Sequence, residues 1–368
     1  MNPAPATPSA EAVRAALARI VDPYTENDLV ASQAVRGVGV DGANVAIELQ
    51  LGYPALGWHE ALAAEVRRVV AESVPGVAQV TVGISTRVVA HRVQKELTPL
   101  PEVRNIIAVA SGKGGVGKST TAVNLALALA AEGARVGVLD ADIHGPSIPM
   151  MLGLSGVPES PDGKSVEPKL AHGLQAISIG LFLGEDTPAI WRGPMTTQYL
   201  QQLLTTTAWK QLDYLVIDLP PGTGDIQLTL AQRVPVSAAI IVTTPQDIAL
   251  LDARRALKMF EKVEVPVLGI VENMAVHVCS QCGHAEHIFG EGGGARIAER
   301  YGVPLLGSLP LDIRIREQAD SGAPTVVAEP DSAIALAYRE IARKAAGRLS
   351  MQARNKSIAF PNIVVQNT

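Results

Sequence analysis

The sequence has little that would indicate a secreted, membrane-spanning or nucleic-acid-binding protein. Its 368 residues include two cysteines, too few for a disulfide framework, and 4% aromatic residues, too few for base-stacking platforms. Lys and Arg number 31 against 36 Asp and Glu, so no basic surface for nucleic acid is expected. No apolar run approaches the roughly 18–20 residues that cross a bilayer. We therefore expect a cytoplasmic protein with neither a nucleic-acid nor a membrane partner.

The length and composition indicate two domains. A chain of 368 residues is longer than the roughly 100–200 residues of one domain, and 47% hydrophobic residues excludes global disorder. Pro99 and Pro101 restrict the backbone and predict a linker between the domains. The expected parts are a flexible end over residues 1–10, a small α+β domain over 11–96, a linker over 97–104, a main domain over 105–348 and a flexible tail over 349–368.

Apolar spacing predicts the elements of both domains. In the small domain it predicts helices over residues 11–21 and 59–70 and strands over 44–50 and 78–84. In the main domain, strand-like runs alternate with helical stretches, which is typical of an α/β fold with a mostly parallel sheet covered by helices on both faces. Residues 155–169 read as a surface insertion. The expected strands are 106–110, 136–139, 174–179, 214–217, 238–242, 267–271 and 305–309, and the expected last helix is 332–348.

A glycine-rich loop follows the first of these main-domain strands. Residues 112–119 read G-K-G-G-V-G-K-S, which matches the phosphate-loop pattern G-x4-G-K-[ST] in its required place between a strand and a helix. Backbone N–H groups and the helix amino end bind phosphate in such a loop, Lys118 reaches the β- and γ-phosphates, and Ser119 binds Mg²⁺. The residues expected to bind nucleotide here are Gly112, Lys113, Gly114, Gly115, Val116, Gly117, Lys118, Ser119 and Thr120.

Carboxylates follow two other strands of the main domain. Asp218 ends an apolar strand, as the Mg²⁺-associated carboxylate of a P-loop enzyme does, and we expect it to serve the ion together with the loop hydroxyl. Asp140 and Asp142 also follow a strand, at the sheet edge where ligands bind in such folds. We expect Asp140 to be a buried acceptor near the loop, His144 to lie in a turn and Asp225 to cap the next helix.

The two cysteines lie three positions apart, as Cys279 and Cys282. This spacing suits a metal or redox site in a reducing compartment. His284 and His287 lie close by, so a zinc site within one chain is one interpretation, although most zinc sites place the second ligand pair farther along the chain. An iron–sulfur site that uses thiolates from more than one chain is the other.

Taken together, these motifs resemble one family of P-loop proteins. A lysine at the second loop position, here Lys113, is typical of the deviant Walker A motif of the MinD/ParA ATPases, the nitrogenase iron protein and the Mrp/ApbC-like iron–sulfur cluster carriers. The order N-M, C-x2-C and F-G-x-G-G-G over residues 273–294 resembles the Mrp-type carriers and is foreign to the partition ATPases. The resemblance covers about residues 103–345.

This resemblance implies an ATP-hydrolysing homodimer that transfers a [4Fe–4S] cluster to apo iron–sulfur proteins, with other cluster assembly factors as further partners. Lys113 is implied to reach the nucleotide of the facing subunit, Asp142 to orient the attacking water and Asn273 to bind adenine, so Lys113, Lys118 and Asp142 form the expected catalytic set. Cys279 and Cys282 of two chains supply the four thiolates that a bridging cluster needs.

The amino-terminal residues resemble a second known unit, the small iron–sulfur assembly domain. Val21-Asp22-Pro23-Tyr24, Asn27-Asp28-Leu29 and Pro75-Gly76-Val77 carry this resemblance over about residues 10–90. Residues 51–57 contain no cysteine, where many relatives have one, so docking or regulation is expected of this domain in place of thiolate chemistry.

Two other functions stay open on the sequence. One is a MinD/ParA-like positioning ATPase whose dimer binds a surface, which a basic amphipathic carboxyl-terminal helix would favour. The other is an adaptor that zinc stabilises and that uses nucleotide as a structural ligand.

Overall fold

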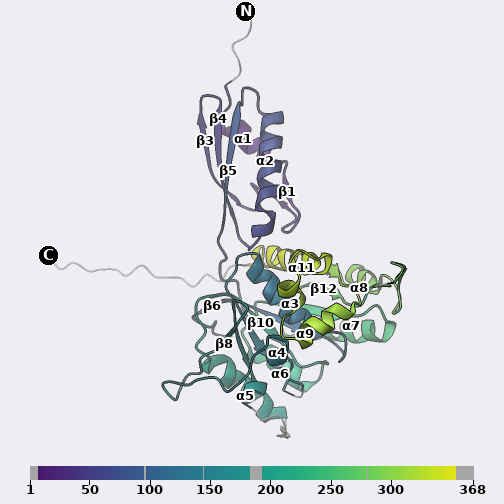
Figure 1. Cartoon of the computed structure of the whole chain (residues 1–368). Helices are drawn as coiled ribbons and strands as arrows, with labels where there is room; N and C mark the ends of the chain where they lie inside the picture. Colours follow the sequence, from purple (N-terminus) through teal and green to yellow (C-terminus); the bar gives the residue numbers. More distant parts are fainter. Residues whose placement is uncertain (1–6, 95–96, 144, 183–192, 280, 354–368) are drawn as a thin grey trace, which may run out of the picture.

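The computed structural model of the chain describes residues 7–94, 97–143, 145–182, 193–279 and 281–353 (Figure 1). The predicted turn residue His144, residues 1–6 of the predicted flexible end and residues 354–368 of the predicted tail lie outside the described residues. None of the described helices combines the length and the apolar character needed to cross a bilayer.

An eight-stranded sheet forms the centre of the main domain, in the order β15-β12-β11-β6-β10-β7-β9-β8. All neighbouring strands are parallel except β8 and β9, so the predicted mostly parallel sheet is confirmed. The strands are β6 (Val103–Ala110), β7 (Val136–Asp140), β8 (Lys169–Ala171), β9 (Leu174–Ser178), β10 (Leu212–Asp218), β11 (Ala238–Thr243), β12 (Val267–Glu272) and β15 (Leu305–Ser308).

Two details of this sheet differ from the sequence-based expectation. The edge strand β8 begins at Lys169, where the predicted surface insertion ends, and turns into β9 through His172 and Gly173, which both have positive φ. Three residues are too few to produce a readable strand pattern. In addition, β6 begins at Val103, inside the predicted linker and two residues before the predicted start of the main domain.

Helices cover both faces of the sheet, because alternate residues of the central strands face opposite cores. In β6, Ile107 and Val109 belong to one core, which α3 and α11 cover, and Ile106 and Ala108 belong to the other, which α5 to α8 cover (Figure 1). The helices of this domain are α3 (Lys118–Ala131), α4 (Ile148–Met151), α5 (Gly193–Thr206), α6 (Asp225–Arg233), α7 (Asp247–Lys262), α8 (Gly293–Tyr301), α9 (Ile313–Asp320), α10 (Thr325–Ala328) and α11 (Ala333–Ser350), with a 3-10 turn η2 (Ile179–Leu181).

The amino-terminal part is a small α+β unit around a three-stranded sheet in the order β3-β4-β5. β3 and β4 form a hairpin across Gly42, whereas β4 and β5 are parallel and are joined through α2. The predicted helices and strands are present, but the first helix ends at Leu17, and Val21, the last residue predicted for it, belongs to β1. β3 was not predicted because glycines interrupt its alternation. The elements are α1 (Ala10–Leu17), β1 (Val21–Asp22), β2 (Asn27–Asp28), β3 (Val35–Asp41), β4 (Asn44–Leu51), η1 (Leu56–Trp58), α2 (His59–Ser73) and β5 (Gln79–Thr86).

The amino-terminal unit contacts the main domain at α11 and at the end of α3 (Figure 1). The carboxylate of Glu132, at the end of α3, is fully buried and accepts a hydrogen bond from the backbone N–H of Gly57 at 2.8 Å. The same carboxylate pairs with Arg339 at 2.7 Å and Arg343 at 3.0 Å, both on α11. Arg343 also pairs with Glu340 at 3.0 Å, and the Tyr24 hydroxyl donates to the same carboxylate at 3.0 Å. Buried charge therefore joins the two parts of the chain.

Candidate functional site

The phosphate loop, residues 112–119, connects the central strand β6 to α3 and needs glycine at defined positions. Gly115 and Gly117 both have φ of 79°, in the left-handed region that favours glycine. A Cβ atom at Gly117 would collide with the side-chain amide of Asn273, and one at Gly112 would collide with the backbone of Asp252 on α7. The loop is thus packed closely between the end of β12 and α7.

The residues predicted to act on phosphate and Mg²⁺ are brought together at the start of α3. The Lys118 side chain is 6% exposed, and its Nζ lies 2.5 Å from Asp218 Oδ1, 3.2 Å from Ser119 Oγ and 3.7 Å from Asp142 Oδ2. The Lys118 ammonium and the N–H groups at the amino end of α3 can bind an anionic phosphate. The two carboxylates beside the ammonium can bind the cation that accompanies the phosphate.

The carboxylate of Asp218 has one oxygen available for a metal ion. Its Oδ1 accepts from Lys118, whereas its Oδ2 is buried and has no hydrogen-bond partner among the described residues. Burial raises the pKa of Asp218, and the Lys118 ammonium acts in the opposite direction. Carboxylate and hydroxyl oxygens are ligands that Mg²⁺ prefers. Asp218 and the nearby Ser119 therefore fit the ion.

Asp140 lies directly opposite Asp218 in the pairing of β7 with β10. It is fully buried and accepts hydrogen bonds from the backbone N–H of Asp142 at 3.1 Å, from the N–H of Ile148 at 3.2 Å and from the Ser178 hydroxyl at 3.0 Å. Burial, together with the negative charge of Asp218, raises the pKa of Asp140 to about 7. Asp140 is thus an acceptor that holds the turn carrying Asp142, in agreement with the prediction.

Lys113 and Asn273 differ in how far solvent reaches them. Lys113 is exposed, and none of the described acidic side chains pairs with it. Asn273 is buried beneath the loop, where its Nδ2 donates to the Val116 carbonyl at 2.9 Å and its backbone N–H donates to Thr243 at 2.7 Å. Its predicted contact with adenine stays a prediction.

Asp225 does not cap α6 as the sequence suggested. The cap position is Gly224, which makes no side-chain cap hydrogen bond, and Asp225 is the first residue of the helix. An acidic side chain in a first helical turn still interacts favourably with the helix dipole, so the sequence signal was sound but one position displaced.

The two cysteines lie on an exposed hairpin, residues 277–286, formed by β13 (His277–Val278) and β14 (Ala285–Glu286). The Cys279 N–H donates to His284 at 2.9 Å and the Gly283 N–H donates to Cys279 at 2.8 Å, which closes the turn. Backbone N–H groups of Gln281 and Cys282 lower the pKa of the Cys279 thiol. Because the thiolate is the form that binds metals, this turn favours the ligand state of Cys279.

The histidines near the cysteines do not gather into a metal site with them. His287 Nδ1 lies 2.8 Å from the Ala275 carbonyl, and His284 is exposed beside Glu286. Among the described residues, no three His, Cys, Asp or Glu side chains are grouped so that they could hold a metal ion. The arrangement within one chain therefore gives the zinc interpretation no support.

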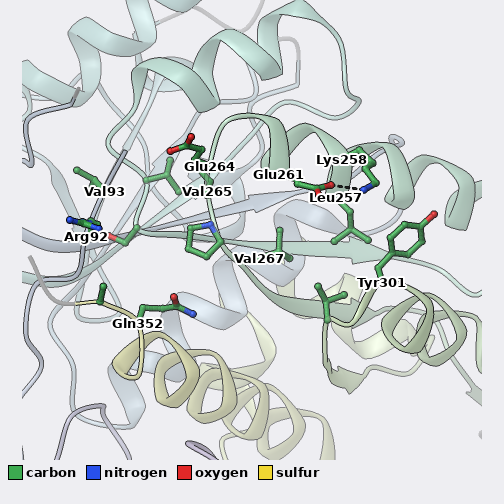
Figure 2. Close-up of a pocket in the computed structure, with 15 residues that line it drawn as sticks. Arg92, Val93, Leu257, Lys258, Glu261, Glu264, Val265, Val267, Tyr301 and Gln352 are labelled. Carbon is green, nitrogen blue, oxygen red and sulfur yellow. Dashed lines mark hydrogen bonds and ion pairs between the residues drawn. The ribbon is translucent and has the colours of Figure 1, made fainter. Parts of the chain in front are cut away.

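A cavity of about 540 Å³ lies away from both sites (Figure 2). Its lining includes Val236, Val265 and Val267, at the amino-terminal ends of β11 and β12, together with Tyr301 and Gln352. The phosphate loop follows the carboxyl end of β6, which is parallel to β11 and β12. The cavity and the phosphate loop therefore lie at opposite ends of the parallel strands. We do not assign this cavity to the nucleotide.

Comparisons with known proteins agree with this geometry. Residues 102–346 match the model of a family described as NUBPL iron-transfer P-loop NTPase, and residues 10–82 match that of an iron–sulfur cluster assembly protein. The chain is 49% identical over 359 residues to the iron–sulfur cluster carrier protein of Escherichia coli strain K12, covering 96% of each. The carrier protein of Pseudomonas fragi is 61% identical over 269 residues, which is 73% of this chain and 94% of the relative.

A solved structure extends the comparison to a bound nucleotide. The nucleotide-binding protein from Archaeoglobus fulgidus, in complex with ADP, is 38% identical to the chain, with a TM-score of 0.55. The match covers 63% of this chain and 90% of that one.

Proposed function

Because the chain belongs to the family of NUBPL-type iron-transfer P-loop NTPases, we propose that it hydrolyses ATP as a homodimer and delivers a [4Fe–4S] cluster, held between its subunits, to apo iron–sulfur proteins. It is an iron–sulfur cluster carrier with an amino-terminal iron–sulfur assembly domain. We propose in addition the homodimer, the [4Fe–4S] type of the cluster, the hydrolysis of ATP and the transfer to clients. We also propose that the protein works with other assembly factors in a reducing cytoplasm.

The observation that carries the proposal is a pair of thiols of which neither is buried, with Cys282 exposed and Cys279 partly exposed. Cys279 and Cys282 are the chain's two cysteines, both are free, and they lie on a hairpin that projects from the main domain. A four-cysteine cluster needs two such pairs, and a two-fold dimer is the simplest assembly that provides them. The backbone N–H groups around Cys279 favour the thiolate without any further ligand from the same chain.

The nucleotide site supports hydrolysis of ATP. Lys118 would neutralise charge on the β- and γ-phosphates, and Ser119 and Asp218 would hold Mg²⁺, which supplies electrostatic stabilisation of the transferred phosphoryl group when bound. Asp142, held by Asp140, would orient the attacking water. The exposed Lys113 would reach the nucleotide of the facing subunit and stabilise charge there, as an arginine finger does.

Anaerobic reconstitution with iron and sulfide tests this function. We expect a brown protein with about four irons per dimer, and we expect Cys279→Ala and Cys282→Ala each to lose the cluster. His284→Ala and His287→Ala are the matched controls from the same hairpin region and should keep it, because neither histidine is needed when four thiolates are present. ATP hydrolysis should survive the loss of either cysteine at least in part. One tightly bound zinc per chain with no visible absorbance would contradict the proposal.

A further inference from the structure

Glu272, the last residue of β12, closes the segment that carries the cysteines. The segment runs from residue 273 to residue 293, and we call it the hairpin segment. Its two ends meet at the Glu272 carboxylate, because Oε1 accepts a hydrogen bond at 2.7 Å from the backbone N–H of Gly294, in the first turn of α8. The carboxylate is buried, and its other oxygen accepts from the Ser308 hydroxyl on β15 at 3.2 Å.

The glycines at the start of α8 permit this contact. A Cβ atom at Gly294 would lie 2.9 Å from Glu272 Cβ, and one at Gly293 would lie 2.6 Å from the Pro245 carbonyl, just before α7. Neither glycine has a positive φ, so close approach accounts for them and backbone strain does not. The F-G-x-G-G-G pattern is thus explained in part as a place where α8 packs tightly against Glu272.

The next residue, Asn273, contacts the phosphate loop. Its side-chain amide donates to the Val116 carbonyl at 2.9 Å. The same amide lies so close to Gly117 that a Cβ atom at that position would collide with it. Beyond it, the base of the hairpin is fixed by Ala275, whose N–H donates to Leu309 at 2.9 Å and whose carbonyl lies 2.8 Å from His287 Nδ1. Asn273 therefore ties the start of the hairpin segment to the phosphate loop, and the neighbouring Glu272 ties its end to the same place.

We propose that Glu272 couples the nucleotide site to the cysteine hairpin by clamping both ends of the hairpin segment beside the phosphate loop. A displacement of the loop on nucleotide binding moves Asn273, and because Glu272 fixes α8 to the same point, the hairpin moves as one body and does not absorb the displacement at its base. Glu272 is a positioning residue that contacts neither ligand. The effect of this coupling on cluster transfer rests on the proposed function. The coupling itself is measured without a cluster, as a change in the reactivity of the two thiols.

The experiment compares how fast iodoacetamide alkylates Cys279 and Cys282 in the full chain without iron, with and without saturating Mg–ADP. Alkylation takes place in the conformations that expose the thiols, so its rate follows the population of those conformations. Coupling between two sites typically shifts such populations by about 5-fold or more, and we expect the wild-type rate to change by about that factor. In Glu272→Ala the ratio should fall to within about twofold of one, because the start of α8 is released. Light scattering checks that the oligomeric state is the same with and without Mg–ADP, so that a partner subunit does not shield the thiols.

Ser308→Ala is the matched control. It removes a hydrogen bond to the same carboxylate but leaves the contact with Gly294, so its ratio should equal that of the wild type. Should Glu272→Ala fail to fold, Gly294→Ala carries the test, since its added methyl group separates α8 from Glu272 and should also lower the ratio.

Two results would overturn the inference: a wild-type ratio of one, or a ratio unchanged from wild type in a folded Glu272→Ala or Gly294→Ala protein. Loss of cluster binding in reconstitution, with a nucleotide-dependent alkylation rate intact, would refute the proposed function and leave the coupling standing.

Discussion

Replacing Glu132 with glutamine should weaken the junction between the amino-terminal domain and the P-loop domain. The Glu132 carboxylate follows α3, is fully buried, and lies between Arg339, Arg343 and the backbone N–H of Gly57. The arginine side chains are 19% and 13% exposed, so water does little to solvate their charge. Glutamine has nearly the same shape but only one acceptor oxygen, so if that oxygen accepts from Gly57, its NH2 group faces the donors of both arginines. The substitution therefore removes both the negative charge and the acceptor that the two arginines share.

The magnitude follows from which partners each arginine keeps. Arg343 still pairs with Glu340 at 3.0 Å, but Glu132 is the one carboxylate that pairs with Arg339 among the described residues. Removing one partner of a buried ion pair costs about 3–5 kcal/mol, because the remaining charge stays buried without compensation. We expect a loss of free energy of unfolding in that range.

Urea denaturation with fluorescence detection measures the loss, and limited proteolysis of residues 87–102 reports whether the two domains separate. Glu26→Gln is the control at the same junction: Glu26 pairs with Arg348 at 2.9 Å, but these side chains are 69% and 30% exposed. An exposed pair of this kind contributes about 0–1 kcal/mol. A Glu132→Gln protein within about 1 kcal/mol of wild type would refute the argument, since burial would then have no bearing on what the ion pair contributes.

Three further variants test the nucleotide site. Lys118→Ala should abolish ATP binding, measured by calorimetry, because the phosphate charge loses its buried cation; normal hydrolysis by the folded variant would remove the nucleotide site from this loop. Asp142→Asn should bind ATP with near-normal affinity but hydrolyse it far more slowly, and an unchanged phosphate-release rate would place the water-orienting group elsewhere. Lys113→Ala should lower turnover more than affinity, and heterodimers of Lys113→Ala with Lys118→Ala chains should regain at most one working site; full activity of a strictly monomeric sample would argue against a role across the dimer.

The phosphate loop could be predicted because its groups are contiguous in the chain. Eight successive residues between a strand and a helix specify it, so no knowledge of the tertiary structure is needed. Asp142 and Asp218 are far apart in sequence, but the carboxyl ends of parallel strands meet at one edge of the sheet, so their meeting with Lys118 was also predictable.

The residues that connect the parts of the molecule could not be predicted in this way. Glu132 follows a helix in an ordinary surface pattern, and its partner Arg339 is 207 residues away. Glu272 ends a buried strand, and the partner by which it holds α8 is a backbone N–H, which leaves no signal in side-chain chemistry. Local patterns report which elements form, whereas a buried charge is explained only by what packs over it.

The contacts made by Glu132 and by Glu272 both lead back to the phosphate loop. The loop touches Asp252 of α7 at Gly112 and Asn273 at Gly117, both without room for a Cβ atom, and its last residues begin α3. Close-packed contacts of this kind shift as units and do not deform gradually. α3 spans 14 residues, about 21 Å, and is followed directly by Glu132 under the amino-terminal domain. The amino-terminal domain, which contains no cysteine, is therefore seated at the far end of the helix that begins with Lys118. From this position we expect docking or regulation of it, because a shift of α3 at the phosphate loop reaches its contact at Glu132 directly.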